Sequence, residues 1–331
     1  MITLLQTHQP LLVLSVLLLI VIVILWGLQY VVIRYGKSAF MLIKRYWHKF
    51  EQYFGVDKRL THLKNSQPKL YQFLWRRLHA QHFHGLPLNI LSLLMIYIAA
   101  VFVGLVEDVV TSDSIVALDH LVSQQMSLLS EAGVIDVFIA ITSLASTPIT
   151  ILVMLLTAMV CWVVRQRYII IGLLIAVIGS TIFTFVTKML FQRARPIDIL
   201  LLESTYSFPS GHATVTVALY GFLAYIAIRF SERFAVQVRI VMMTILVTVL
   251  IGLSRIVLNE HYLSDVLGGY LVGTLWLTVA ISVTEWLTIK DKINWQITWS
   301  NAQIYLVWFS VVGVLMSTLI YARIYQFPLL L

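Results

Sequence analysis

The chain alternates between long apolar runs and shorter polar connections. A helix of about 20 apolar residues crosses roughly 30 Å of hydrocarbon. Eight runs reach that length and are predicted to be transmembrane helices: 11–33, 88–106, 146–164, 169–189, 213–230, 238–257, 265–287 and 303–322. The sequence shows neither an internal repeat nor the period-two alternation of a half-buried strand. It therefore predicts an all-α, polytopic membrane protein.

Composition agrees with this class, since hydrophobic residues make up 60% of the 331 positions and charged residues 11%. One water-soluble core needs far less apolar surface. The net charge of +8 raises the question of whether the protein binds nucleic acid. Proteins that do so interleave basic and aromatic residues on a solvated face. Here most bases lie beside apolar runs, so we expect no nucleic-acid partner. The single cysteine, Cys161, cannot form an intramolecular disulfide.

The first apolar run begins near Leu11 and has to be distinguished from a signal peptide. No Lys or Arg precedes it, it continues through Val32, and no small-x-small cleavage site follows. We therefore interpret it as a retained transmembrane helix.

The loop charges predict an orientation in the membrane. Eleven Lys and Arg lie between Arg34 and Arg77, none lies between Leu78 and Val164, and six acids lie within residues 107–136. The first loop is then cytoplasmic and the second external. Alternation places 18 of the 23 basic residues inside, and the exceptions are Lys188, Arg193, Arg195, Arg255 and Arg323. Four of these five lie in or beside the polar clusters described below.

Residues 34–84 form a basic connector with an amphipathic start. Its large apolar residues recur at spacings of three and four, which suits a helix in the headgroup layer: Phe40, Ile43, Trp47, Phe50 and Phe54. We interpret the connector as a cytoplasmic anchor, with a partner-binding or regulatory helix as the alternative. His79, His82 and His84 have no acid or cysteine beside them, so metal binding is not favoured.

The predicted external segment 107–145 contains one amphipathic stretch. One helical face carries Ile115, Leu118, Leu121, Val122 and Met126, so this face is expected to lie against the membrane. The helix is either a plain cover or a part of the path by which a lipid reaches the site.

The first of three polar clusters contains Lys188, Arg195 and Pro196. Lys188 and Arg195 are seven residues apart, or two helical turns, and face the same way if the helix continues past the membrane edge. Pro196 then ends the helix. Two such cations can neutralise a phosphate, although interfacial bases that snorkel to water give the same pattern.

The second cluster is Pro209-Ser210-Gly211-His212, directly before an apolar run. A turn of this kind directs backbone N–H groups and a helix N-terminus at an anion. Ser210 adds a hydroxyl, and Gly211 allows close approach. His212, in the first turn, is placed to act on a leaving oxygen.

The third cluster contains Ser254, Arg255, His261 and Asp265. On a helix, His261 and Asp265 lie one turn apart, so the carboxylate can accept a proton from one ring nitrogen and leave the other as a nucleophile. Arg255 adds a third cation. A histidine and an aspartate at a helix start are often structural, but charged groups near a membrane favour function.

Together the patterns Lys-x6-Arg-Pro, Pro-Ser-Gly-His and Ser-Arg-x5-His-x3-Asp resemble the three-part signature of the type 2 phosphatidic acid phosphatase and vanadium haloperoxidase superfamily. The signature spans 188–265. The resemblance implies a six-helix phosphatase core over 88–287. Outside it lie an N-terminal helix with the basic connector over 1–87 and an extra C-terminal helix within 288–331.

The resemblance also implies roles for these residues. Lys188, Arg195 and Arg255 are expected to hold the phosphate with Ser210 and the Gly211 amide. His261 is expected to attack phosphorus and form a phosphohistidine, with Asp265 orienting it, while His212 protonates the departing oxygen and then activates water. The family works without a metal ion, so no cofactor is expected. Arg193 is not a signature position and is left outside the catalytic set.

The expected function is therefore a lipid phosphatase or diphosphatase acting at the external side of a bacterial-type inner membrane. The candidate substrates are undecaprenyl diphosphate, phosphatidylglycerol phosphate and phosphatidic acid. Haloperoxidase activity is associated with soluble relatives and is disfavoured by eight spans. A non-catalytic protein of the same fold that binds or transports lipid phosphates is the alternative, and the intact His212, His261 and Asp265 argue against it.

Overall fold

The computed structural model of the protein describes residues 9–53, 68–69, 86–127, 132–197 and 205–324. No strand occurs among these residues. Eight helical segments within the described ranges are long and apolar enough to cross a membrane, which confirms the predicted all-α, polytopic architecture. The candidate spans are Leu18–Tyr46, Leu88–Thr111, Ile135–Val163, Ile169–Phe191, Gly211–Arg229, Phe234–Val257, Leu263–Ile289 and Asn301–Ile324.

The first half of the chain supplies helices α2 (Gln9–Tyr53), α5 (Leu86–Thr111), α6 (Asp113–Ser127), α7 (Ala132–Ser143) and α8 (Thr147–Val163). The next two spans each contain a π-helical segment of five residues. One span is α9 (Ile169–Leu174), η1 (Ile175–Gly179) and α10 (Ser180–Phe191), and the other is α11 (Gly211–Val215), η2 (Thr216–Tyr220) and α12 (Gly221–Arg229). Helices α13 (Phe234–Val257), α14 (Leu263–Ile289) and α15 (Asn301–Ile324) complete the described chain.

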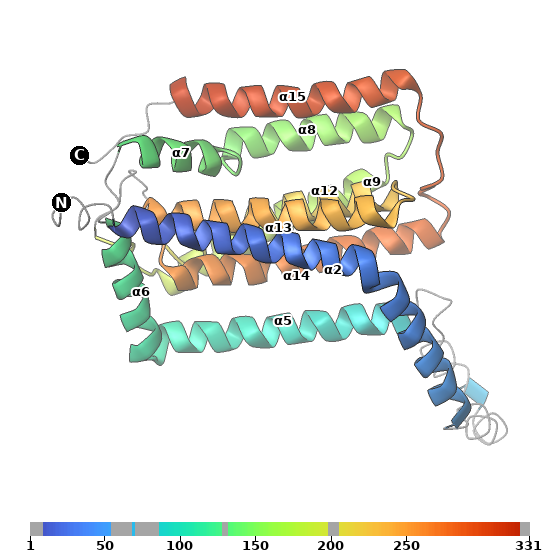
Figure 1. Ribbon diagram of the computed structural model, residues 1–331, viewed down its shortest axis with the longest axis horizontal. Coiled ribbons are helices and arrows are strands. Elements are labelled where there is room, and N and C mark those ends of the chain that lie inside the picture. Colours follow the sequence, from blue (N-terminus) through green and yellow to red (C-terminus); the bar gives the residue numbers. More distant parts are fainter. Residues whose placement is uncertain (1–8, 54–67, 70–85, 128–131, 198–204, 325–331) are drawn as a thin grey trace.

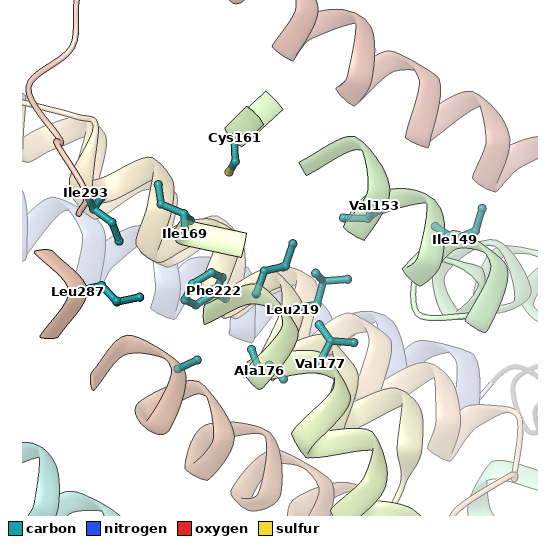
Figure 2. Close-up of a cluster of buried hydrophobic side chains, with 13 residues drawn as sticks. Ile149, Val153, Cys161, Ile169, Ala176, Val177, Leu219, Phe222, Leu287 and Ile293 are labelled. Atoms are coloured by element: carbon teal, nitrogen blue, oxygen red, sulfur yellow. The ribbon is translucent and has the colours of Figure 1, made fainter. Parts of the chain in front are cut away.

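Helix α14 is the central element of the bundle. It contacts α5, α11, both π-helical segments, α9 and α10, whereas α2 packs on α13 and α15 packs on α7 and α8 (Figure 1). The largest apolar core joins α9 and η1 to η2, α12 and α14 (Figure 2). Within it, Ile169, Leu173, Leu219 and Phe222 are at most 1% exposed.

One end of the bundle holds the start of α2, the end of α15 and the transverse helix α6 (Figure 1). The end of α13 and the start of α14 lie at this end as well. The turn between α13 and α14, which carries His261, therefore lies at this end of the apolar bundle.

The N-terminal region differs from its predicted organisation. The sequence suggested a helix over 11–33 followed by a separate surface helix, but α2 runs without interruption from Gln9 to Tyr53. No proline follows Pro10 within α2, so nothing breaks the backbone hydrogen bonds at the predicted boundary. Phe40 and Ile43 are on this helix and are 68% and 67% exposed. Phe54 and the histidines 79, 82 and 84 lie outside the described residues.

The segment predicted as one external stretch, 107–145, is also organised differently. Helix α7 and the turn after it lead directly into α8, and the candidate span begins at Ile135 rather than at residue 146. The apolar residues of α6 have two kinds of surroundings. Val122 and Met126 pack against the protein, whereas Leu118 and Leu121 are 49% and 57% exposed.

Two glycines let the second polar cluster approach α14. A Cβ at Gly269 would lie 2.6 Å from the Ser210 carbonyl oxygen, and a Cβ at Gly273 would lie 2.6 Å from that of Thr214. The backbones of α11 and α14 are therefore in direct contact. This contact fixes the start of α11 beside the first turn of α14.

We predict that Gly269→Ala lowers the free energy of unfolding by roughly 1–3 kcal/mol, because the new methyl group must push α11 away from α14. The matched control is Gly313→Ala on α15, where an added Cβ meets nothing within 4 Å. The comparison requires unfolding curves of both variants in the same detergent. Equal stability of the two variants would contradict the proposed backbone contact.

Candidate active site

The three polar clusters of the sequence meet at one end of the bundle. Lys188 lies in the last turn of α10, Arg255 in the last turn of α13, and Asp265 in the first turn of α14. The Ser210-Gly211-His212 turn opens α11, and His261 lies between α13 and α14. Residues more than 70 positions apart in the sequence are thus brought together.

Lys188 and Arg195 converge, but not on a common helix as predicted. Helix α10 ends at Phe191, and Gln192 adopts a left-handed conformation with φ of 45°, so Arg195 lies in a non-helical segment. Convergence comes instead from Thr205. Its hydroxyl oxygen lies 3.0 Å from Arg195 Nη2 and 3.5 Å from Lys188 Nζ. Lys188 also donates a hydrogen bond to the Tyr206 carbonyl.

A buried carboxylate that the sequence analysis did not single out lies between two of the predicted cations. Glu260 is fully buried, and its Oε2 lies 3.3 Å from Arg195 Nη1 and 3.7 Å from Arg255 Nη2. Arg195 Nη1 also donates to the Glu260 carbonyl at 2.7 Å, and Arg255 Nη1 donates to Thr142 on α7 at 3.2 Å. Buried guanidinium groups need such partners. The feature of the sequence that could have indicated Glu260 is its position directly before His261.

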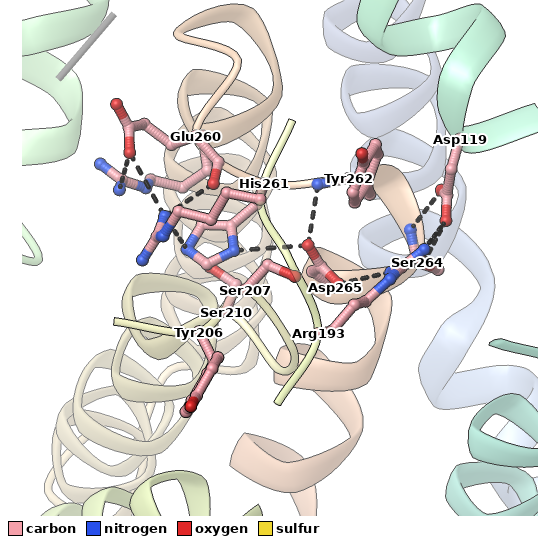
Figure 3. A network of polar contacts seen from close by, with 12 residues as sticks. Asp119, Arg193, Tyr206, Ser207, Ser210, Glu260, His261, Tyr262, Ser264 and Asp265 are labelled. Atoms are coloured by element: carbon pink, nitrogen blue, oxygen red, sulfur yellow. Dashed lines mark hydrogen bonds and ion pairs between the residues drawn. The ribbon is translucent and has the colours of Figure 1, made fainter. Parts of the chain in front are cut away.

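His261 and Asp265 face each other, with Nδ1 of the imidazole 3.5 Å from Oδ2 of the carboxylate (Figure 3). The prediction that both lie on one helix is wrong, because α14 begins at Leu263 and Tyr262 is its N-cap. Asp265 Oδ2 also accepts the Tyr262 N–H at 2.9 Å. On the other side of the ring, Nε2 lies 3.5 Å from Arg195 Nη1. One ring nitrogen thus faces a carboxylate and the other faces the cations.

The surroundings of His261 keep its imidazole neutral. Burial is the largest cause that holds its pKa well below the ordinary value of 6.5, followed by the charges of Arg195, Arg255 and Lys188. A hydrogen bond with the Ser207 backbone acts in the opposite direction and is weaker. A neutral imidazole has a free lone pair, which a nucleophile requires.

The start of α11 carries features of an anion site. Ser210 is fully buried, and its Oγ has no hydrogen-bond partner among the described residues. The Ser210 N–H donates to the Asp265 carbonyl at 2.9 Å, which ties this turn to α14. A Cβ at Gly211 would meet nothing within 4 Å, so the space beside this residue is open. The first N–H groups of a helix have no intrahelical acceptor and favour an anion there.

His212 lies in the same electrostatic neighbourhood. It interacts with Lys188, Arg195, Arg255 and His261 and is partly buried. The structure therefore brings all eight sequence-predicted site residues to one region: Lys188, Arg195, Ser210, Gly211, His212, Arg255, His261 and Asp265.

Arg193 lies directly behind this region. Its guanidinium contacts Asp265 Oδ1 at 2.6 Å and Asp119 Oδ2 of α6 at 2.7 Å (Figure 3). Sequence reasoning left Arg193 out, although it was one of the bases that break the charge rule. Nothing in the sequence pattern linked Asp119 to it, because the two residues are 74 positions apart.

The parts of the chain that the structure describes hold no group of three or more His, Cys, Asp or Glu arranged to bind a metal ion. The chemistry that the arrangement itself supports is anion binding by three cations next to a neutral imidazole. The nearby carboxylate can orient the ring and stabilise the positive charge that develops on it while the opposite nitrogen forms a bond.

Comparison with known proteins gives consistent results. The sequence model of the PAP2 superfamily matches residues 169–289, which include all three clusters. Phosphatidylglycerophosphatase B of Bacillus subtilis (strain 168) is 26% identical over 168 residues, which are 50% of this chain and 82% of that protein.

The fold is similar to the crystal structure of a transmembrane PAP2-type phosphatidylglycerolphosphate phosphatase from Bacillus subtilis. The TM-score is 0.54 and the identity 23%, over 58% of this chain and 96% of the other. Residues 169–289 of this membrane-spanning helical chain thus match the PAP2 superfamily, and the chain is similar in fold to a membrane protein of that family.

Proposed function

We propose that the protein is a membrane lipid phosphatase, which removes phosphate from a lipid phosphate or diphosphate by way of a phosphohistidine. The observation that carries the proposal is the His261–Asp265 pair at 3.5 Å, whose second ring nitrogen faces Arg195. The short distances between this imidazole and the cations support the proposal that both act on the same phosphorus atom. The family match and the membrane-spanning helices support a substrate embedded in lipid.

The proposed binding of the phosphate uses charge and hydrogen bonds together. Lys188, Arg195 and Arg255 supply three positive charges, and Glu260 beside two of them removes one. The remaining charge matches a phosphate monoester dianion. The buried Ser210 hydroxyl and the N–H groups at Gly211 complete the site from the opposite side.

The proposed reaction has two steps. In the first, His261 Nε2 attacks phosphorus while the bond from phosphorus to the lipid oxygen breaks, and His212 gives that oxygen a proton. The Asp265 carboxylate, whose Oδ2 lies 3.5 Å from Nδ1, stabilises the positive charge that develops on the ring. In the second step, His212 takes a proton from water, the water oxygen attacks phosphorus, and His261 leaves as a neutral imidazole. The products are the dephosphorylated lipid and inorganic phosphate.

The candidate substrates are phosphatidylglycerol phosphate, undecaprenyl diphosphate and phosphatidic acid. The Bacillus subtilis relative is named for phosphatidylglycerophosphate, which makes that lipid the first to test. We also propose that the reaction takes place at the external face of the inner membrane and without a metal ion. The charge asymmetry of the loops supports the orientation.

We predict that the detergent-purified protein releases phosphate from at least one of these three lipids in the presence of EDTA. His261→Ala should lower the release at least about a thousandfold, because the nucleophile is lost. The matched control is Arg323→Gln, an exposed base outside the site, which should keep full activity. His212→Ala should also lower the release strongly, because both the protonation of the leaving oxygen and the activation of water use this side chain.

Phosphate release that disappears with EDTA would contradict the metal-independent mechanism. A folded wild-type protein that binds these lipids but releases no phosphate from any of them would instead favour the non-catalytic reading. Folding is checked for each variant by its unfolding curve and its elution on size exclusion.

We predict that the acid limb of kcat/KM lies below pH 6.5, because the pKa of His261 is held below that value. Protonation of the imidazole removes the nucleophile, so activity falls only when the pH drops to that lowered pKa. Among the nearby charges, that of Arg195 lowers the pKa of His261 most. Arg195→Gln should therefore raise this pKa and move the acid limb to higher pH. An unchanged limb, after correction for the titration of the substrate phosphate, would contradict this electrostatic account.

We predict that a topology reporter inserted after Lys292 reads as cytoplasmic and one inserted after Ser127 reads as external. The first site follows a run that the alternation places at the basic, inner side, and the second follows the acidic external segment. The opposite pair of readings would place the candidate active site at the cytoplasmic face.

A further inference from the structure

Arg193 binds the side chain of Asp265 from behind, on the side opposite His261. Its Nη1 lies 2.6 Å from Asp265 Oδ1 and 2.7 Å from Ser264 Oγ, and its guanidinium lies over the Tyr262 ring at 4.5 Å. Its own carbonyl accepts the Ser207 N–H at 2.9 Å. Arg193 therefore connects the segment after α10 to the residues on both sides of the start of α14.

Helix α6 holds Arg193 in this place. Asp119 is 2% exposed, and its Oδ2 lies 2.7 Å from Arg193 Nη2. The same carboxylate accepts the Ser264 N–H at 3.0 Å and the Ser264 hydroxyl. The polar side of α6 is thus bonded to the first turn of α14, at the residue directly before Asp265.

The same helix also contacts the turn that carries His261. Ser123 donates to Asn259 Oδ1 at 2.7 Å, and the His120 ring lies edge-on to Tyr262 at 5.4 Å. Asn259 has a left-handed backbone with φ of 53°, so this contact lies where the chain reverses between α13 and α14. Helix α6 therefore fixes the His261 turn on both sides of the histidine.

The two carboxylate oxygens of Asp265 have different partners, and this difference bears on how Asp265 orients His261. Oδ1 is taken by Arg193, which leaves Oδ2 for the Tyr262 N–H and for His261 Nδ1. Asp265 is fully buried, and a buried carboxylate stays ionised only when partners compensate its charge. An ionised carboxylate with a fixed plane is what the imidazole needs for orientation.

We propose that Arg193 is a positioning residue, which keeps Asp265 ionised and turned toward His261, and that Asp119 of α6 holds Arg193 for this task. The inference rests on the proposed phosphatase function and adds α6 to the parts of the molecule on which the reaction depends. Neither residue is placed on the phosphate or on the reacting atoms.

Several charged and titratable groups surround Asp265. Lys188 of α10 and Arg193 of the following segment contribute positive charge, and Asp119 of α6 contributes negative charge. His261 and Tyr262 face it from the turn before α14. Of these groups, the Arg193 guanidinium contacts the carboxylates of both Asp119 and Asp265. Its replacement therefore has the most direct effect on Asp265.

The test measures kcat, KM and inhibition by inorganic phosphate across pH for Arg193→Gln, with the lipid that the wild-type enzyme cleaves best. We expect kcat to fall between about tenfold and a hundredfold, because the His261–Asp265 pair is misplaced. KM and phosphate inhibition should stay within about twofold, which is a ~0.4 kcal/mol change. The acid limb should move to higher pH, since a carboxylate without its guanidinium partner is neutralised more readily.

Three further variants separate positioning from mere stability. Arg193→Lys retains the charge and should recover part of kcat and of the acid limb. Asp119→Asn should lower kcat less than Arg193→Gln, and the double variant should lose no more than Arg193→Gln alone, because Asp119 acts through Arg193. Arg323→Gln, an exposed base outside this network, is the control and should match the wild type.

Wild-type phosphate release in the same assay reports on the proposed function itself. An active wild type whose Arg193→Gln variant keeps both kcat and the acid limb would overturn the positioning role alone. A loss of equal size at every pH, accompanied by a lower unfolding temperature and no recovery by Arg193→Lys, would also overturn it, because a purely structural contact behaves in that way.

Discussion

The backbone contact between α11 and α14 is the constraint on which the candidate site depends. Gly269 and Gly273 leave room for the carbonyl groups of Ser210 and Thr214, and the Ser210 N–H then reaches the Asp265 carbonyl at 2.9 Å. This single approach joins the anion-binding turn to the helix that carries the aspartate. The cations belong to other segments. Lys188 and Arg195 both contact the Thr205 hydroxyl, and Arg255 lies in the last turn of α13.

Burying so much charge at the end of an apolar bundle requires compensation inside the protein. Two carboxylates provide it in different places. Glu260 lies beside Arg195 and Arg255 in front of the histidine, whereas Asp119 lies beside Arg193 behind it. These contacts separate Arg195 and Arg255, which lie beside Glu260 at the proposed phosphate site, from Arg193, which faces Asp265. In the proposed reaction Arg195 and Arg255 bind the phosphate, whereas Arg193 orients Asp265 for the histidine.

The sequence predicted the spans, and it predicted which polar residues lie close together, because both leave local signals. Apolar runs of membrane length mark the helices, and three short motifs mark the cluster at residues 188–265. The errors arose where local periodicity was extended too far. Arg195 and His261 were placed on helices that end at Phe191 and begin at Leu263, because a capping turn depends on distant contacts. Asp119 and Glu260 were missed, since their importance comes from arginines that only the fold brings near.

The π-helical segment Ile175–Gly179 lies within the fourth candidate span and sets the direction in which the later residues of that span point. A π turn holds one residue more than an α turn, so it rotates everything that follows by about 100° relative to an uninterrupted α-helix. Lys188 lies nine residues after Gly179 in the helix that follows, so its direction depends on this rotation. The insertion or deletion of one residue between this segment and Lys188 would rotate the lysine by about 100° away from its present direction. The register of this span is therefore a constraint of its own, separate from its apolar composition.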